Sequence, residues 1–174
     1  RCNTALYDLE TGTETLLPFY AVEFQMDDQY YYYIEAVTPG SFEQTLTRMD
    51  RQTQEREVLY ESRPGFRMGD RLSYGDGFLA WAEYDPEGAP EDGFELWAYD
   101  LERGETFQIA ERCYGTLNHY FKINQGYLVY HTEQADNANP YIMVCYDLAQ
   151  RRPAFEKEFL VEPFDYTFDG TYLA

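Results

Sequence analysis

The segment Trp97-Ala98-Tyr99-Asp100-Leu101 carries the pattern that decides the fold, a short apolar strand that ends in Asp-Leu before a polar turn. Successive aspartates of this pattern are 42, 50 and 47 residues apart. A period of about 40–50 residues is typical of repeats that each form one four-stranded sheet. The other copies are Ala5-Leu6-Tyr7-Asp8-Leu9, Thr47-Arg48-Met49-Asp50-Arg51 and Val144-Cys145-Tyr146-Asp147-Leu148.

The repeated aspartate has a physical reason at the end of a strand. Its carboxylate accepts backbone N–H groups two residues further on and starts a turn, so we interpret it as a turn former and not as a catalyst. Gly12 and Gly104 lie four residues after the aspartate and can adopt the positive φ that a hairpin turn needs. Gln54 and Arg151 take that place in the other two copies, so those turns either differ in geometry or carry strain.

A second repeat lies before each aspartate and consists of a turn followed by an aromatic-rich strand. Asp-Gly before an apolar run is a strong hairpin signal. The strands are apolar on both faces, which indicates a sheet packed on both sides. We interpret the Tyr30 to Tyr33 run as such a strand, with a stacking platform for sugar as the alternative. The four strands begin at Tyr30, Phe78, Tyr127 and Thr171.

Two further strands complete each period, one before the aromatic-rich strand and one after the Asp-marked turn. No stretch shows sustained helical periodicity. The sequence therefore predicts an all-β fold, a β-propeller with four-stranded antiparallel blades. The first strands are expected at Phe19 to Met26, Arg67 to Tyr74, Leu117 to Ile123 and Pro163 to Phe168, and the last at Glu14 to Leu17, Glu57 to Tyr60, Phe107 to Ala110 and Phe155 to Phe159.

Residues 1–174 are expected to form a single propeller domain or a fragment of one. Its parts are 1–17 (third and fourth strands), 18–62, 63–112, 113–161, and 162–174 (first and second strands). Two interpretations follow. The chain is either a fragment of a larger propeller, or a four-bladed ring in which the N- and C-terminal strands share a sheet and remove its exposed edges. Pairing of open blade edges between copies is a variant of the first.

The segment Phe78-Leu79-Ala80-Trp81-Ala82-Glu83, followed after a loop by Leu96-Trp97-Ala98-Tyr99-Asp100-Leu101-Glu102-Arg103-Gly104-Glu105, resembles the blade repeat of TolB-type propellers. The resemblance extends over almost the whole chain. It implies the propeller fold and favours a location outside the cytoplasm. The residues themselves indicate no localisation. Propellers of similar type also gate the active sites of serine peptidases of the prolyl oligopeptidase type.

Composition restricts the partners. The chain has 13 Lys and Arg against 32 Asp and Glu, a net charge of −19. Such a surface repels nucleic-acid phosphates and anionic membranes, and it favours either simple solubility or a cationic partner. No apolar run is long enough for a membrane helix, so no direct membrane insertion is expected. The three cysteines show no metal-ligand or disulfide spacing.

The longest predicted loops join the second and third strands, and they are rich in oxygen ligands. We expect them to be solvated, with a cation site as the alternative, although neither loop has the regular acid spacing of a dedicated calcium loop. The candidate metal ligands are Asp85, Glu87, Glu91, Asp92, Asp136, Asn137 and Asn139. The candidate partner-binding residues are Arg63, Arg67, Tyr84, Asp85, Glu87 and Asp136.

Arg63 and Arg67 flank Pro64-Gly65-Phe66 between two blades. They either recognise a carboxylate or form local salt bridges with the many acids. His119 and His131 are the only histidines, and each is expected to be packed or exposed, not a ligand.

No catalytic motif and no cofactor-binding motif is present in this chain. The sequence therefore favours a non-catalytic binding module for a protein or peptide. Two alternatives stay open: the gating propeller of a larger enzyme such as a serine peptidase, and a carbohydrate-binding propeller.

Overall fold

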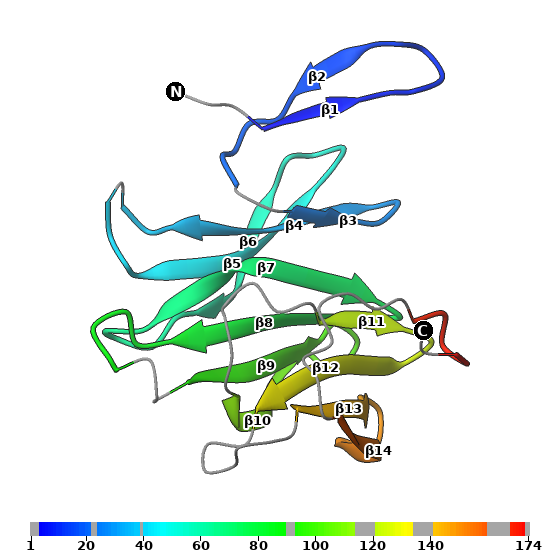
Figure 1. Cartoon of the computed structure of the whole chain (residues 1–174). Coiled ribbons are helices and arrows are strands. Elements are labelled where there is room, and N and C mark those ends of the chain that lie inside the picture. The colour runs from blue at the N-terminus through cyan, green and yellow to red at the C-terminus, as the bar shows by residue number, and fades with distance from the viewer. Residues whose placement is uncertain are drawn as a thin grey trace.

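The computed structural model describes residues 4–21, 24–38, 40–89, 93–113, 121–133, 141–159 and 168–172. Within them the chain is all-β, and its strands form one two-stranded and three four-stranded antiparallel sheets (Figure 1). In each larger sheet the strands pair in sequence order. The predicted all-β propeller class is therefore confirmed.

Four units follow one another along the chain. The half-blade contains β1 (Ala5–Tyr7) and β2 (Glu14–Leu16). Blade I contains β3 (Phe24–Met26), β4 (Tyr30–Ala36), β5 (Gln44–Asp50) and β6 (Arg56–Glu61). Blade II contains β7 (Arg67–Gly75), β8 (Phe78–Tyr84), β9 (Phe94–Asp100) and β10 (Glu105–Cys113). Blade III contains β11 (Lys122–Asn124), β12 (Tyr127–Glu133), β13 (Tyr141–Asp147) and β14 (Arg152–Phe159).

The units are arranged as an open array. Figure 1 shows the half-blade at the top, blades I and II below it, and blade III at the bottom. Among the described residues, β1 and β2 pair only with each other. The described residues thus form open sheets, as the fragment interpretation expects, and they show no pairing that would close a four-bladed ring.

The Asp-marked turns form as expected. The Oδ1 atom of Asp50 accepts the N–H groups of residues 52 and 53, both at 2.8 Å, and Asp8 and Asp100 accept the same pair of bonds. Gln54 and Arg151 adopt φ of 61° and 53°, close to the 67° and 68° of the glycines at the equivalent positions. The strain alternative is therefore correct, because these turns keep the same left-handed geometry without a glycine.

Two strand predictions differ from the structure. The first strand of blade I begins at Phe24, not at Phe19. The intervening chain is held elsewhere: the N–H of Ala21 donates to the Thr4 hydroxyl at 3.0 Å. Thr171 lies in a bend and not in a strand, since its N–H donates to Asp169 within the turn. Residues 114–120 and 160–167 lie outside the described residues.

The core lies between the units. Tyr31 and Tyr33 of β4 face the half-blade, where the ring of Phe19 stacks on Tyr33 with centroids 3.9 Å apart. Tyr32 faces blade II, where its ring stacks on Tyr74. All three tyrosines are buried, so β4 is packed on both faces as predicted.

Candidate functional site

The connections at one end of blades I and II are tied together by hydrogen bonds. The link from β6 to β7 lies at this end, at the left of Figure 1. Gln44, at the start of β5, donates its N–H to the Ser62 hydroxyl at 2.9 Å, and its side-chain oxygen accepts the N–H of Met68 at 2.8 Å. Gln44 thereby holds both ends of the link between blades I and II, one through its backbone N–H and the other through its side chain.

Arg63 lies in that link and is held by Glu83 of β8. The Glu83 side chain is fully buried. Its carboxylate accepts the backbone N–H and the Nε–H of Arg63, both at 3.0 Å, and the Tyr60 hydroxyl at 3.1 Å. A buried carboxylate is tolerated only when it is paired and hydrogen-bonded, and these donors meet that need.

A second glutamate completes the network. Glu95 lies directly across from Glu83 in the β8–β9 register, and its Oε1 is 2.8 Å from an Arg63 guanidinium nitrogen. Its other oxygen accepts bonds from Trp97 Nε1 and Gln108 Nε2. Burial lowers the pKa of Arg63, but the bonds to Glu95 and Glu83 outweigh this effect and hold the pKa above its ordinary value. Two roles were considered for Arg63, recognition of a carboxylate ligand and a local salt bridge. The structure shows the local salt bridge.

The structure brings most of the described candidate partner-binding residues to one edge of blade II. Arg67 pairs with Tyr84 across β7 and β8, and Asp85 directly follows Tyr84. Asp85 accepts the N–H of Glu87 at 2.8 Å, and both residues are exposed. The candidate residues Glu91, Asp92, Asp136, Asn137 and Asn139, with His119, lie outside the described residues.

Two exposed apolar side chains extend this edge onto blade I. Val37 and Phe42 lie in the loop between β4 and β5, and Phe42 is 52% exposed. The two ends of this loop are joined by a hydrogen bond from the Val37 N–H to the Glu43 carbonyl at 2.9 Å. We call the surface formed by these connections the loop face; it comprises Val37, Phe42, Arg63, Phe66, Tyr84, Asp85 and Glu87.

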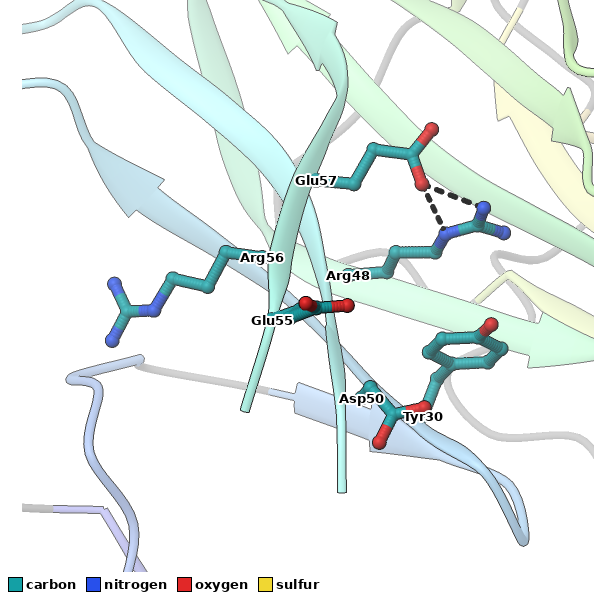
Figure 2. Close-up of a pocket in the computed structure, with 6 residues that line it drawn as sticks. All are labelled: Tyr30, Arg48, Asp50, Glu55, Arg56 and Glu57. Atoms are coloured by element: carbon teal, nitrogen blue, oxygen red, sulfur yellow. Dashed lines mark hydrogen bonds and ion pairs between the residues drawn. The ribbon is translucent and has the colours of Figure 1, made fainter. Parts of the chain in front are cut away.

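A small hollow lies at the opposite end of blade I (Figure 2). It has a volume of about 210 Å³. Arg48 is already paired there, with Nε 2.8 Å from Glu57 Oε2, and its guanidinium lies over the Tyr30 ring. Arg56 points away from Arg48 in Figure 2 and donates to the Pro18 carbonyl at 2.6 Å. Both arginines that line the hollow therefore already have partners.

Clusters of metal ligands and membrane-spanning helices are absent from the part of the chain that the structure describes. No group of three or more His, Cys, Asp or Glu side chains gathers as metal ligands would. No described helix is long and apolar enough to cross a membrane. His131 is buried on β12, in agreement with its interpretation as a packed residue.

The sequence did not identify Glu83, Glu95 and Gln44 as residues that shape this face. Glu83 carried one usable signal, since it follows the apolar run Phe78 to Ala82 without a polar break. A charge that continues a buried strand needs a partner. The cross-strand position of Glu95 became visible only with the β8–β9 register.

The comparison with known proteins identifies the fold. No protein-family model and no curated protein matches the chain. Among solved structures, the β-propeller domain of the Trilobed protease from Pyrococcus furiosus aligns with a TM-score of 0.59 and 13% identity over 84% of this chain. TolB from Acinetobacter baumannii aligns with 0.56 and 12% over 86%. The acylaminoacyl peptidase of Pyrococcus horikoshii aligns with 0.56 and 13% over 87%.

The chain spans less than half of each of these structures, namely 44%, 36% and 26% of their lengths in the same order. At such low identity the likeness shows the fold alone. Together with the stacked four-stranded sheets, it establishes that this chain has a β-propeller architecture that resembles TolB-type propellers.

Proposed function

We propose that this chain is a non-catalytic interaction module whose loop face binds a basic segment of another protein or a basic peptide. The observation that carries the proposal is the buried Glu83 carboxylate, which accepts hydrogen bonds from Arg63 and so holds the link between blades I and II in place. A binding surface on a rigid support loses little entropy when a partner binds. The likeness to TolB supports a location outside the cytoplasm as part of this proposal.

Charge and exposure define the partner. The chain carries 32 acids against 13 bases, and on the loop face Asp85 and Glu87 are exposed beside a link whose arginine is already paired. Val37 and Phe42 add exposed apolar area on the same face. A segment that combines Arg or Lys with an apolar residue matches both features.

Binding of short synthetic peptides, measured by fluorescence anisotropy, tests the proposal. A peptide of Arg and Leu is expected to bind, and binding should weaken as salt rises; a peptide of Glu and Leu should not bind. Phe42→Ser should weaken binding about tenfold, as expected for an apolar anchor. Val58→Ser on β6 is the matched control, because Val58 is 51% exposed but lies away from the loops. Equal binding of both peptides, or an equal effect of both substitutions, contradicts the proposal.

The second candidate is the gating propeller of a larger hydrolase, and the alignment with an acylaminoacyl peptidase supports it. Its test uses the full-length product of the gene with a fluorophosphonate probe, which labels activated serines. Labelling that is lost on heat denaturation supports this candidate function, and the absence of labelling contradicts it. A carbohydrate platform finds less support, since the rings of Tyr31, Tyr32 and Tyr33 are buried.

A further inference from the structure

The segment Arg63-Pro64-Gly65-Phe66 forms a tight turn on the loop face. The N–H of Phe66 donates to the Arg63 carbonyl at 2.9 Å, and Gly65 has a φ of 82°. A type II turn requires a positive φ at its third position and favours proline at its second, and this segment supplies both. The turn folds the chain back, so that the Arg63 Cζ atom lies 3.8 Å from the centroid of the Phe66 ring.

The Arg63 guanidinium is also close to a second ring and to two carboxylates. Its Cζ atom is 5.7 Å from the centroid of the Trp97 ring. Its nitrogens lie 3.0 Å from Glu83 Oε2 and 2.8 Å from Glu95 Oε1. Two carboxylates and one guanidinium leave one negative charge in excess. The surroundings of the Phe66 ring therefore favour a cation, even though one face of the ring already lies on Arg63.

Asp85 is a neighbour of Phe66 at the end of the β7–β8 pair. Arg67 lies across from Tyr84. Phe66 directly precedes Arg67 and Asp85 directly follows Tyr84, so the two residues extend the same pair of strands by one position. The Asp85 side chain is exposed, and its Oδ1 accepts the N–H of Glu87 at 2.8 Å. Its second carboxylate oxygen can accept further hydrogen bonds.

We propose that Phe66 and Asp85 form the subsite for the basic side chain of the partner, and that this subsite selects arginine over lysine. The inference rests on the proposed function, because it assigns residues to one part of the same peptide. A guanidinium is planar and weakly hydrated, so it can lie flat on the outer face of the Phe66 ring while its edge donates to Asp85. The ammonium group of lysine is compact and strongly hydrated, and it gains less from the ring.

The assignment leaves the apolar residue of the peptide to other parts of the loop face. Val37 and Phe42 are each more than half exposed, and both belong to the loop of blade I, whereas Phe66 and Asp85 flank the β7–β8 pair of blade II. The basic and apolar residues of the partner are thus bound by different blades. The rigid link between the blades fixes the relative position of the two subsites.

Fluorescence anisotropy with two labelled peptides that differ only in one Arg or Lys, each beside Leu, tests the inference. The wild-type protein should bind the Arg peptide about two- to fivefold more tightly, as a cation–π contact at an exposed site predicts. Phe66→Leu keeps the apolar bulk but removes the ring, so it should abolish this preference. Phe155→Leu is the matched control, because Phe155 is 55% exposed on β14 of another blade, and it should leave the preference unchanged.

Asp85→Asn tests the second contact independently of the ring. The asparagine oxygen can still accept the N–H of Glu87, so the local turn is retained, but the negative charge is lost. Binding of the Arg peptide should weaken about two- to fivefold, the value of an exposed ion pair, and it should depend less on salt. Circular dichroism checks that each variant keeps its strand content.

The outcomes separate this inference from the proposed function. Equal affinity of the wild-type protein for the two peptides overturns the inference alone, and this comparison needs no variant. A preference that survives Phe66→Leu, or unchanged binding of the Arg peptide to Asp85→Asn, also overturns the inference while the proposed function stands. Failure of both peptides to bind the wild-type protein overturns both.

Discussion

Equivalent residues make the contacts at the junction of blades I and II and at the junction of blades II and III. The groups that interact differ between the two junctions. Asp27, Gly75 and Asn124 each precede the turn into the second strand of their blade. At the first junction, Asp27 Oδ2 accepts the Tyr74 hydroxyl of blade II at 3.2 Å. At the second, the backbone of Gly75 lies so close to Ile123 that an added Cβ would be 2.8 Å from Ile123 Cγ2.

At each junction the contacted residue lies one position before the equivalent residue of the next blade. Tyr74 directly precedes Gly75, and Ile123 directly precedes Asn124. Asn124 continues the rule by donating to the Phe168 carbonyl at 3.1 Å. The contact geometry thus repeats while its chemistry changes from a carboxylate–hydroxyl bond, to backbone contact, to an amide–carbonyl bond. The repeat specifies where blades touch, and the residue at that place specifies how.

The buried side chains at the two junctions also differ. The junction of blades I and II is aromatic, with the Trp81 ring 4.9 Å from that of Tyr60 and the Tyr32 ring 5.1 Å from that of Tyr74. The junction of blades II and III is built mainly from smaller side chains, and its buried members include Ala80, Ala82, Leu96, Ala98, Leu128 and Val144. Substitutions can therefore test each type of junction separately.

Trp81→Ala should have the largest effect, because it removes the central ring of the aromatic junction. Removal of a buried tryptophan costs about 3–5 kcal/mol, measured as the free energy of unfolding in urea. Trp81→Phe should cost much less, since Nε1 of Trp81 makes no hydrogen bond within the described residues. A cost for the alanine variant no greater than that for phenylalanine would show that this ring does not hold the junction.

Gly75→Ala should have the next largest effect, on the junction of blades II and III. The added methyl group would meet Ile123 Cγ2 and also its carbonyl oxygen, at 3.1 Å. Overpacking of this kind costs about 1–3 kcal/mol. Gly69→Ala is the control, because its Cβ would be 3.4 Å from the Ala82 Cβ, an ordinary contact. Equal urea midpoints for the two variants would contradict close packing at Gly75.

Tyr74→Phe should have a smaller effect on the aromatic junction. It removes the hydroxyl that donates to Asp27, while the ring that stacks on Tyr32 stays. Loss of one such bond costs about 0.5–1.5 kcal/mol. Tyr20→Phe, at an exposed ring, should leave thermal stability unchanged. If both variants have the same melting temperature, the hydroxyl makes no net contribution.

The acid dependence of the Asp27 carboxylate should give the smallest effect. Burial raises the pKa of Asp27, but hydrogen bonds from the N–H of Tyr30 and the hydroxyls of Tyr32 and Tyr74 outweigh it and hold the pKa below its ordinary value. The stabilisation by the Asp27 carboxylate is then present above about pH 4 and is lost as the pH falls through the folded-state pKa.

Asp27→Asn isolates this contribution, because Asp8, Asp50 and Asp169 titrate in both proteins. The difference in unfolding free energy between wild type and variant should shrink as the pH falls from about 6 to about 2.5. The measurement is a series of urea titrations at fixed salt. A difference that stays constant over this range would mean that the charge of the Asp27 carboxylate makes no net contribution to stability.

The number of strands in each repeat could be predicted from the sequence, because the hydrogen bonds of the Asp-marked turns join residues that are close in the sequence. Asp50 accepts the N–H groups of the residues two and three positions after it, and that information is contained in a few consecutive positions. The left-handed conformation at Gln54 was open to prediction for the same reason, since Gly12 and Gly104 occupy equivalent places.

The site was less predictable, because its contacts depend on how distant segments meet. Arg63 was recognised as a residue with either a ligand or a local acid as partner, but Glu83 lies 20 residues away on another strand. The position of Glu95 depends on strand register, and that of Gln44 on the link between blades. The role of Asp85 and Glu87 in binding a partner stays a prediction.

The lateral contacts between blades have a consequence for how the molecule comes apart. They join β3 and β4 to β7, and β7 and β10 to β11 and β12, so each unit is supported by its immediate neighbours. Stability in such arrays is approximately a sum of nearest-neighbour terms. Exchange of backbone amide hydrogens should therefore be graded along the chain, slowest in blade II and faster toward both ends, with no single barrier shared by all the strands.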